Sequence, residues 1–344
     1  MGQALAGTSP RVPVLAQMHE FVAAHLGIPR REFFSQPEVM VSASLEVQAK
    51  FGLDVASISY DVYNIEAEAL GQPIVHLDGG MPDIDRSALL VRGRQDLQRI
   101  RTPDFDAVPA CRRVIDMHRI FQRLTGLTPR LSCCAPFTLA TNLRGIEPFL
   151  LDICAEPDFA RELLDRLTEE VLAPWVRYQA RHLPGTGRVS AVDATASPPI
   201  VNLQLLRDWV APSILRLRAL TGLDVYTANW VGERHLREPE AMFEQKLRVC
   251  PDVLWGQDPD VEHLGPERYK TYAVRRSVPL ILGVGAAFLA EASPGEVARR
   301  VRHYATVGGQ GGRFALYLCN LGATTPAENL RAAVQAAHEG AAGC

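Results

Sequence analysis

The chain has 344 residues, of which 47% are hydrophobic and 22% are charged. This balance is typical of a globular protein with a large core and excludes general disorder. The formal net charge of -3, from 36 basic and 39 acidic side chains, provides no basic footprint for nucleic acid and no polybasic patch for a membrane surface.

Eight short runs of apolar and β-branched residues recur along the chain, and helical patterns separate them. The runs cover residues 12–17, 55–61, 130–137, 188–195, 224–230, 253–259, 279–285 and 313–319. Helix start and stop signals lie between them, such as Ser293 with Pro294 and the terminating Gly222. Strands that alternate with helices pair in parallel through right-handed crossovers. The sequence therefore predicts an α/β fold, a single (β/α)8 TIM barrel over residues 1–344, with residues 1–11 extended or disordered.

One segment interrupts this repeat after the second run. Residues 71–93 are rich in Gly, Pro and Asp, which are the residues that favour turns. We expect an inserted hairpin and loop after strand 2 rather than a second domain.

The seven cysteines indicate a reducing compartment. They are odd in number and scattered, with no Cys-x-x-Cys pair, which is typical of free thiols rather than of a disulfide framework. The first dozen residues do not read as a secretory signal, and no apolar run approaches the roughly 18 residues of a membrane span. We therefore expect a cytoplasmic protein whose partners include neither nucleic acid nor a membrane.

The carboxyl ends of the predicted strands supply the candidate site residues, because the active site of a barrel lies at that face. Asp61 and Asp193 are the predicted catalytic acid and base, since a desolvated carboxyl titrates closer to neutrality. Helix capping or an ion pair is the alternative role for each. The predicted substrate-binding or cofactor-binding residues are Gln17, His19, Tyr63, Asn142, Asn229, Trp230, Gln257, Gly283, Gly285, Cys319 and Asn320.

Three segments carry a resemblance to a known family. "SISYDVYNIEAEALG", "APFTLATNLRG" and "GGRFALYLCNLGATTPAENLRAAVQAAHE" resemble the uroporphyrinogen decarboxylase superfamily, which also contains cobalamin-dependent methyltransferases. The decarboxylase branch implies arginines after the first strand, an aspartate after the second, a tyrosine and a late histidine. Asp61 matches the aspartate, but the other positions read Met18, Val22, Asn142 and Ala323. Met and Val cannot hold the acidic side chains of a uroporphyrinogen.

The methyltransferase branch implies a zinc that activates a thiol, held by His-x-Cys after the fifth strand and by a Cys after the eighth. The first two positions here read Thr227 and Asn229, and only Cys319 matches. One ligand of three does not hold zinc, so we expect no metal. Cys319 itself stays open between a buried apolar cysteine, a pocket contact, and a metal ligand with partners such as His19 or Glu66.

The resemblance and these departures together imply an enzyme, a methyltransferase. It would move a methyl group between a small non-thiol substrate and the cobalamin of a partner corrinoid protein. A decarboxylating lyase that acts on a smaller acid is one alternative, and a catalytically silent binding homologue is another. A homodimer is left open.

Overall fold

The computed structural model describes residues 2–76 and 80–339. Its residue contacts form two compact units, one of residues 1–60 with 231–344 and one of residues 61–230. Each unit has its own parallel sheet. Among the described residues, no helix is both long and apolar enough to cross a membrane.

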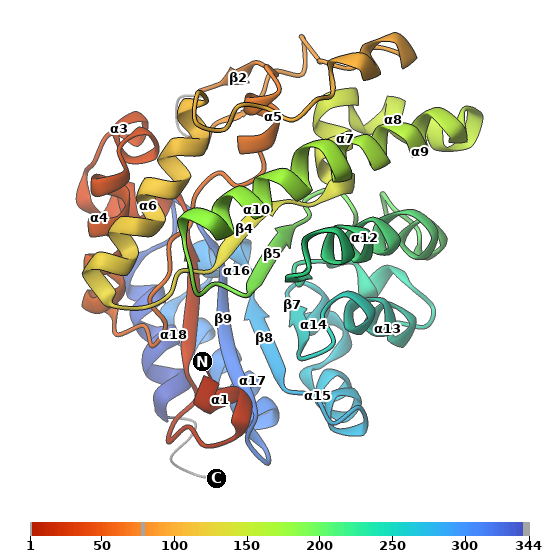
Figure 1. Cartoon of the computed structure of the whole chain (residues 1–344). Coiled ribbons are helices and arrows are strands. Elements are labelled where there is room, and N and C mark those ends of the chain that lie inside the picture. The colour runs from red at the N-terminus through yellow and green to blue at the C-terminus, as the bar shows by residue number, and fades with distance from the viewer. Residues whose placement is uncertain (1, 77–79, 340–344) are drawn as a thin grey trace. The chain divides into compact units, whose positions relative to one another are not determined.

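The first unit has a four-stranded parallel sheet in the order β1-β9-β8-β7, with α17 beside β9 and α18 beside α17 (Figure 1). Its strands are β1 (Val14–Met18), β7 (Leu254–Gln257), β8 (Leu280–Val284) and β9 (Phe314–Leu321). Its helices are α1 (Gly2–Ala6), α2 (Glu20–Leu26), α3 (Arg30–Ser35), α4 (Pro37–Phe51), η4 (Glu233–His235), α13 (Glu240–Val249), α14 (Asp260–Leu264), α15 (Pro266–Arg275), α16 (Ala286–Glu291), α17 (Pro294–Gly309) and α18 (Ala327–Glu339). The capping box of Ser293 and Glu296 starts α17, as the sequence predicts.

The second unit has a three-stranded parallel sheet in the order β4-β5-β6 and a two-stranded antiparallel hairpin, β2-β3. Its strands are β2 (Ile74–Val75), β3 (Asp83–Ile84), β4 (Leu131–Cys134), β5 (Arg188–Val192) and β6 (Asp224–Tyr226). Its helical segments are α5 (Ile65–Ala69), η1 (Arg94–Arg99), α6 (Pro109–Thr125), α7 (Pro136–Arg144), α8 (Ile146–Ala155), α9 (Pro157–Arg166), η2 (Leu167–Leu172), α10 (Ala173–His182), α11 (Leu203–Leu205), η3 (Leu206–Val210) and α12 (Ala211–Thr221). The hairpin lies within residues 71–93, where the sequence predicts an insertion.

These elements confirm the α/β class with parallel strands. They are consistent with the predicted (β/α)8 barrel, although the strand ladders of the described residues do not close into one ring. Residues 2–6 form a short helix rather than the extended or disordered segment expected for residues 1–11. The Ala-rich sequence favours helix, and the buried Ala4 accepts a hydrogen bond from the Gly7 amide.

The predicted second strand, residues 55–61, forms no regular strand. The side chain of Gln48 takes both main-chain groups of Ser57, with Nε2 donating to the carbonyl at 2.6 Å and Oε1 accepting from the amide at 2.9 Å. The segment still lies along β1, because the Ser59 hydroxyl accepts from the Met18 amide at 3.2 Å. The Gln48 side chain thus makes hydrogen bonds to Ser57 that a neighbouring strand would make if residues 55–61 formed the predicted strand.

Two long helices of the second unit contain π-helical segments, and each lies just before a proline. Segment η2 ends at Leu172, two residues before Pro174, and η3 ends at Val210, two residues before Pro212. Because proline has no amide hydrogen and its ring crowds the preceding turn, a wider turn accommodates it without ending the helix.

Candidate functional site

Asp193, directly after β5, is the centre of a buried polar cluster in the second unit. One carboxylate oxygen accepts a hydrogen bond from the Thr138 hydroxyl at 2.5 Å, and the other accepts one from the Trp230 indole at 3.0 Å. Burial raises the pKa of Asp193 to about 6, against the opposing effect of these donors. The carboxylate is therefore fixed in place and titrates near neutrality.

The local fold brings these three residues together. Thr138 lies in the first turn of α7, which begins just after β4, and Trp230 follows β6. Strands β4, β5 and β6 are parallel neighbours, so the segments after them emerge at one edge of the sheet. This is the edge at which the sequence predicts the site.

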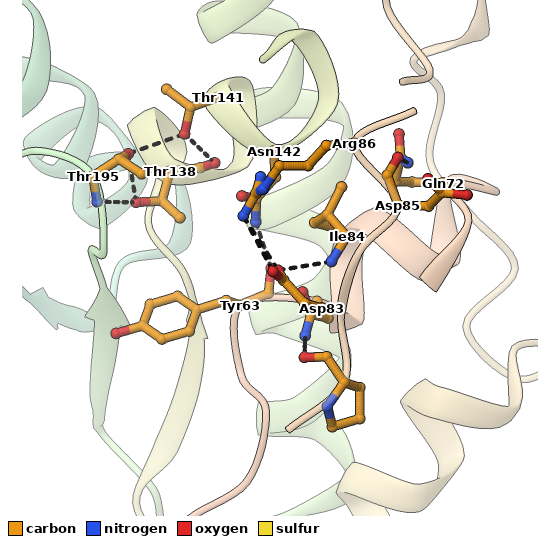
Figure 2. A network of polar contacts seen from close by, with 12 residues as sticks. Tyr63, Gln72, Asp83, Ile84, Asp85, Arg86, Thr138, Thr141, Asn142 and Thr195 are labelled. Atoms are coloured by element: carbon orange, nitrogen blue, oxygen red, sulfur yellow. Dashed lines mark hydrogen bonds and ion pairs between the residues drawn. The ribbon is translucent and has the colours of Figure 1, made fainter. Parts of the chain in front are cut away.

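A cluster of threonine hydroxyls ties the loop after β5 to α7 (Figure 2). The Thr138 oxygen accepts hydrogen bonds from the amides of Ala194, at 2.8 Å, and Thr195, at 3.2 Å. The Thr141 and Thr195 hydroxyls lie 3.0 Å apart. Sequence reasoning missed Thr138, although it stands in the "APFTL" segment that carries the family resemblance.

Tyr63 is held at both its main chain and its ring. The Asn142 amide donates to the Tyr63 carbonyl at 3.0 Å (Figure 2). Asn229 accepts from the Asp193 amide, donates to the Asp193 carbonyl at 2.8 Å, and has its Nδ2 3.5 Å from the Tyr63 hydroxyl. Burial raises the pKa of Tyr63, so the phenol keeps a proton that it can donate to a ligand.

Asp61 is buried and comes two positions before Tyr63 in the sequence. Burial raises its pKa, and the positive charge of Arg113 opposes the rise. No hydrogen bond joins Asp61 and Asp193 among the described residues. The structure therefore places the two predicted catalytic carboxyls in different local environments, Asp193 in a network of donors and Asp61 near an arginine.

Glu66, in α5, is a buried acid that sequence reasoning did not single out as a site residue. Its Oε1 accepts the Cys134 amide at 2.9 Å, and its Oε2 has no hydrogen-bond partner within the described part of the chain. Burial raises its pKa to about 8, so the side chain carries a proton at neutral pH. Nothing in the pattern "NIEAEA" separates this buried acid from its half-exposed neighbour Glu68.

In the first unit, Cys319 of β9 and Gln257 of β7 meet across the end of β8, the strand that lies between them. The Cys319 thiol donates to the Gln257 amide oxygen at 3.3 Å. Burial raises the pKa of Cys319, and the charge of Asp258 raises it further. Cys319 is thus a neutral, buried thiol bound to an amide, and its contact with a substrate stays a prediction.

Gly283 permits this contact. A Cβ atom at Gly283 would lie 2.7 Å from the Cys319 sulfur and 2.8 Å from the Gln257 Cβ, which is closer than carbon atoms pack. At Gly285, likewise, a Cβ would lie 2.9 Å from the Asp258 Cβ, and the Gly285 amide donates to Asp258. The two glycines serve close side-chain packing.

Gly283→Ala is therefore expected to lower the free energy of unfolding by about 1 to 3 kcal/mol, because the added methyl group must displace two packed side chains. Gly322→Ala is the matched control, since a Cβ there would meet nothing within 4 Å. Urea unfolding of both variants checks the prediction. Equal stability of the two variants would contradict it.

The remaining predicted residues of the first unit form two pairs. The Tyr317 hydroxyl donates to Gln17, and a hydrogen bond joins His19 to Asn320. Burial lowers the pKa of His19, and its Nδ1 has no hydrogen-bond partner among the described residues. His19 is therefore a neutral imidazole with one free nitrogen.

The residues at the implied zinc positions do not fit that metal. Thr227 donates its hydroxyl to the Ala191 carbonyl at 2.7 Å, and both amide atoms of Asn229 bind the Asp193 main chain. Hydroxyl and amide groups are also poor zinc ligands beside thiolate and imidazole. Within residues 2–76 and 80–339, no group of three His, Cys, Asp or Glu side chains is placed to hold a metal ion.

Comparisons with known proteins are consistent with this fold. A family model described as "Uroporphyrinogen decarboxylase (URO-D)" matches residues 3–222. A methylated-thiol–coenzyme M methyltransferase from Methanosarcina mazei is 27% identical over 183 residues, which are 52% of this chain and 46% of that protein. The match thus spans about half the length of this relative.

A solved structure agrees over nearly the whole chain. It is a methyltransferase from Methanosarcina mazei with a TM-score of 0.78 and 19% identity, and the match covers 98% of this chain and 96% of that one. At this identity the likeness shows the fold alone. Because the family model covers more than half of the sequence, the chain belongs to the uroporphyrinogen decarboxylase family.

Proposed function

We propose that this chain is a methyltransferase that moves a methyl group between a small non-thiol substrate and the cobalamin of a separate corrinoid protein. The match to a methylated-thiol–coenzyme M methyltransferase supports the reaction class. The observation that carries the choice of substrate is the use of Thr227 and Asn229 as hydrogen-bonding residues where thiol-activating relatives are expected to have zinc ligands. A substrate oxygen or nitrogen atom can release its methyl group when it receives only a proton or a hydrogen bond.

The residues of the second unit supply that assistance. A reduced corrinoid supplied by the partner would accept the methyl group, and the substrate heteroatom would take up one proton. In this proposal, the Tyr63 hydroxyl donates a hydrogen bond to the heteroatom, and Asn229 orients the hydroxyl. Asp61 delivers the proton, while Asp193 holds Trp230 and Thr138 in position. Gln257 and Cys319 stay predicted substrate contacts.

The direct test is to incubate the purified protein with reduced cobalamin and, in turn, methyl ethers, methylamines and methyl thiols, and to follow visible absorbance. Formation of methylcobalamin from an ether or an amine supports the proposal. Methylation from thiols alone would contradict the substrate class. Release of carbon dioxide from a carboxylic acid without any corrinoid would replace the reaction class by decarboxylation.

Tyr63→Phe is expected to lower kcat for methyl transfer by about 100-fold with little change in KM, because a positioned proton or hydrogen-bond donor contributes at least that much to the reaction step. Folding should be nearly unchanged, since Asn229 keeps both bonds to Asp193. Tyr226→Phe, at a buried tyrosine in β6, is the matched control. Full activity in Tyr63→Phe would remove Tyr63 from the mechanism.

A further inference from the structure

The first unit has a strongly basic region at the end of its sheet opposite the strand carboxyl ends. Two cavities, of about 330 and 600 Å³, share Arg11, which precedes β1. We refer to these two cavities together as the basic site. The charged residues that line it are Arg11, Lys50, Arg313, Arg331 and Glu339. Four cations against one carboxylate contrast with the net charge of -3 for the whole chain.

The nearby carboxylates leave the charges of Lys50 and Arg331 available, whereas Arg11 is paired with Asp54. Glu339 lies 3.6 Å from Arg302, which does not line either cavity. Asp54 is bound by Arg11, by the Val14 amide and by His338 at 2.8 Å. Among the described residues that line the site, Glu339 is the only acid, and its ion-pair partner lies outside it.

Two of the cations are free to bind a ligand. Lys50 Nζ lies 2.9 Å from Nε2 of the His25 ring. No carboxylate within the described residues pairs with Lys50 or with Arg331. Both cations lower the pKa of His25, in addition to the effect of burial, which reports the positive potential here. The Arg331 guanidinium lies over the Phe51 ring at 5.2 Å, so its plane is fixed while its N–H edges stay exposed.

We propose that the basic site binds a small multivalent anion of the phosphate class, through Arg331 and Lys50. A planar guanidinium beside an ammonium group matches the oxygen geometry of phosphate. Arg331 and Lys50 both line the cavity of about 600 Å³, which is large enough for a small anion. The basic site lies at the opposite end of the first unit's sheet from the strand end that carries Cys319, so the proposal does not depend on the proposed function.

The test is isothermal titration of the full chain with tripolyphosphate, inorganic phosphate and citrate at low and high salt. We expect saturable binding of tripolyphosphate, weaker binding of phosphate, and a loss of affinity as salt screens the charges. Lys50→Ala with Arg331→Ala should weaken tripolyphosphate binding by at least about tenfold. Arg331→Lys, which keeps the charge but loses the planar fork, should weaken it less than the double variant.

A charge-matched control separates this site from general attraction. Arg268→Ala with Arg299→Ala removes two exposed cations from α15 and α17 of the same unit and should leave binding unchanged. Thermal unfolding of each variant shows that it is folded. The proposal is overturned if tripolyphosphate does not bind, if both double variants lose affinity equally, or if an acidic peptide binds more tightly than tripolyphosphate.

Discussion

Replacing Asp193 with asparagine is expected to lower the free energy of unfolding by roughly 2 to 4 kcal/mol and to reduce methyl transfer by at least about 100-fold. The Asp193 carboxylate accepts from two donors, the Thr138 hydroxyl and the Trp230 indole. An asparagine can accept from only one of them and turns its own NH₂ group toward the other. One buried donor therefore loses its partner, and Trp230 loses its fixed position.

Urea unfolding and kcat with the identified methyl donor measure the two effects separately. Asp116→Asn is the matched control, because Asp116 lies exposed on α6 with only a 3.9 Å contact to Arg119. Stability of Asp193→Asn equal to that of Asp116→Asn would mean that the buried network contributes little to folding. A stable but inactive Asp193→Asn protein would assign Asp193 to catalysis alone.

Trp230→Phe tests the same network through pH. Loss of the indole donor should raise the pKa of Asp193 above its value of about 6, since the donor stabilises the charged form. A raised pKa in the folded state adds stability below the unfolded pKa of about 3.9 that is lost as pH rises through the folded value. The variant should therefore be destabilised more at pH 7.5 than at pH 4, and an equal loss at both would contradict the donor role of Trp230.

The repeating strand and helix patterns predicted most of the fold, because burial on both faces of a parallel strand leaves a continuous apolar run in the sequence. Strand β8, fully buried, is the clearest example. Residues 55–61 show the limit of this reasoning. Their apolar pattern matches that of a strand, but the Gln48 side chain binds the Ser57 main chain, and no local pattern announces a contact between residues nine positions apart.

The candidate site was predictable to the extent that it follows strand ends. Asp193, Asn229 and Trp230 were predicted this way, and the structure joins them by hydrogen bonds. Thr138 was not predicted, and Glu66 was named only as a possible metal partner of Cys319, because the surroundings of both come from burial and from partners distant in sequence. A glutamate in a helix reads as a surface residue until its environment is known.

Cys319 and the residues at the implied zinc positions show the same limit of sequence reasoning. Sequence matching located Cys319 in the position of a metal ligand, and it also showed that Thr227 and Asn229 are not ligands. Sequence matching could not show which hydrogen bonds these side chains make instead. The structure provides this, since Thr227 and Asn229 both bind main-chain atoms at the end of β5, and Cys319 binds Gln257.

Replacing Glu66 with glutamine is expected to remove a large pH dependence from the stability of the protein. In the folded state the pKa of Glu66 is raised by burial from 4.5 to about 8. Its contribution to stability is fully present below the unfolded value and is lost as pH rises through the folded value. Glutamine does not ionise and can still accept the Cys134 amide. The variant should therefore gain stability relative to the unmodified chain as pH rises from about 4.5 to about 8.

The size of the gain should be on the order of 4 to 5 kcal/mol, because each pKa unit corresponds to about 1.4 kcal/mol. Burial raises the pKa of the neighbouring Cys111, Cys133 and Cys134 thiols, which stay neutral in both folded proteins, so their ionisation in the unfolded chain cancels from the comparison. Urea unfolding at pH 5, 7 and 9 gives the profile. Glu68→Gln is the control, because Glu68 is half-exposed and lies 3.7 Å from Arg113. Parallel profiles for Glu66→Gln and the unmodified chain would mean that Glu66 ionises as it does in the unfolded chain. Its unpaired Oε2 would then contact water rather than lie in a water-free environment beside Cys134.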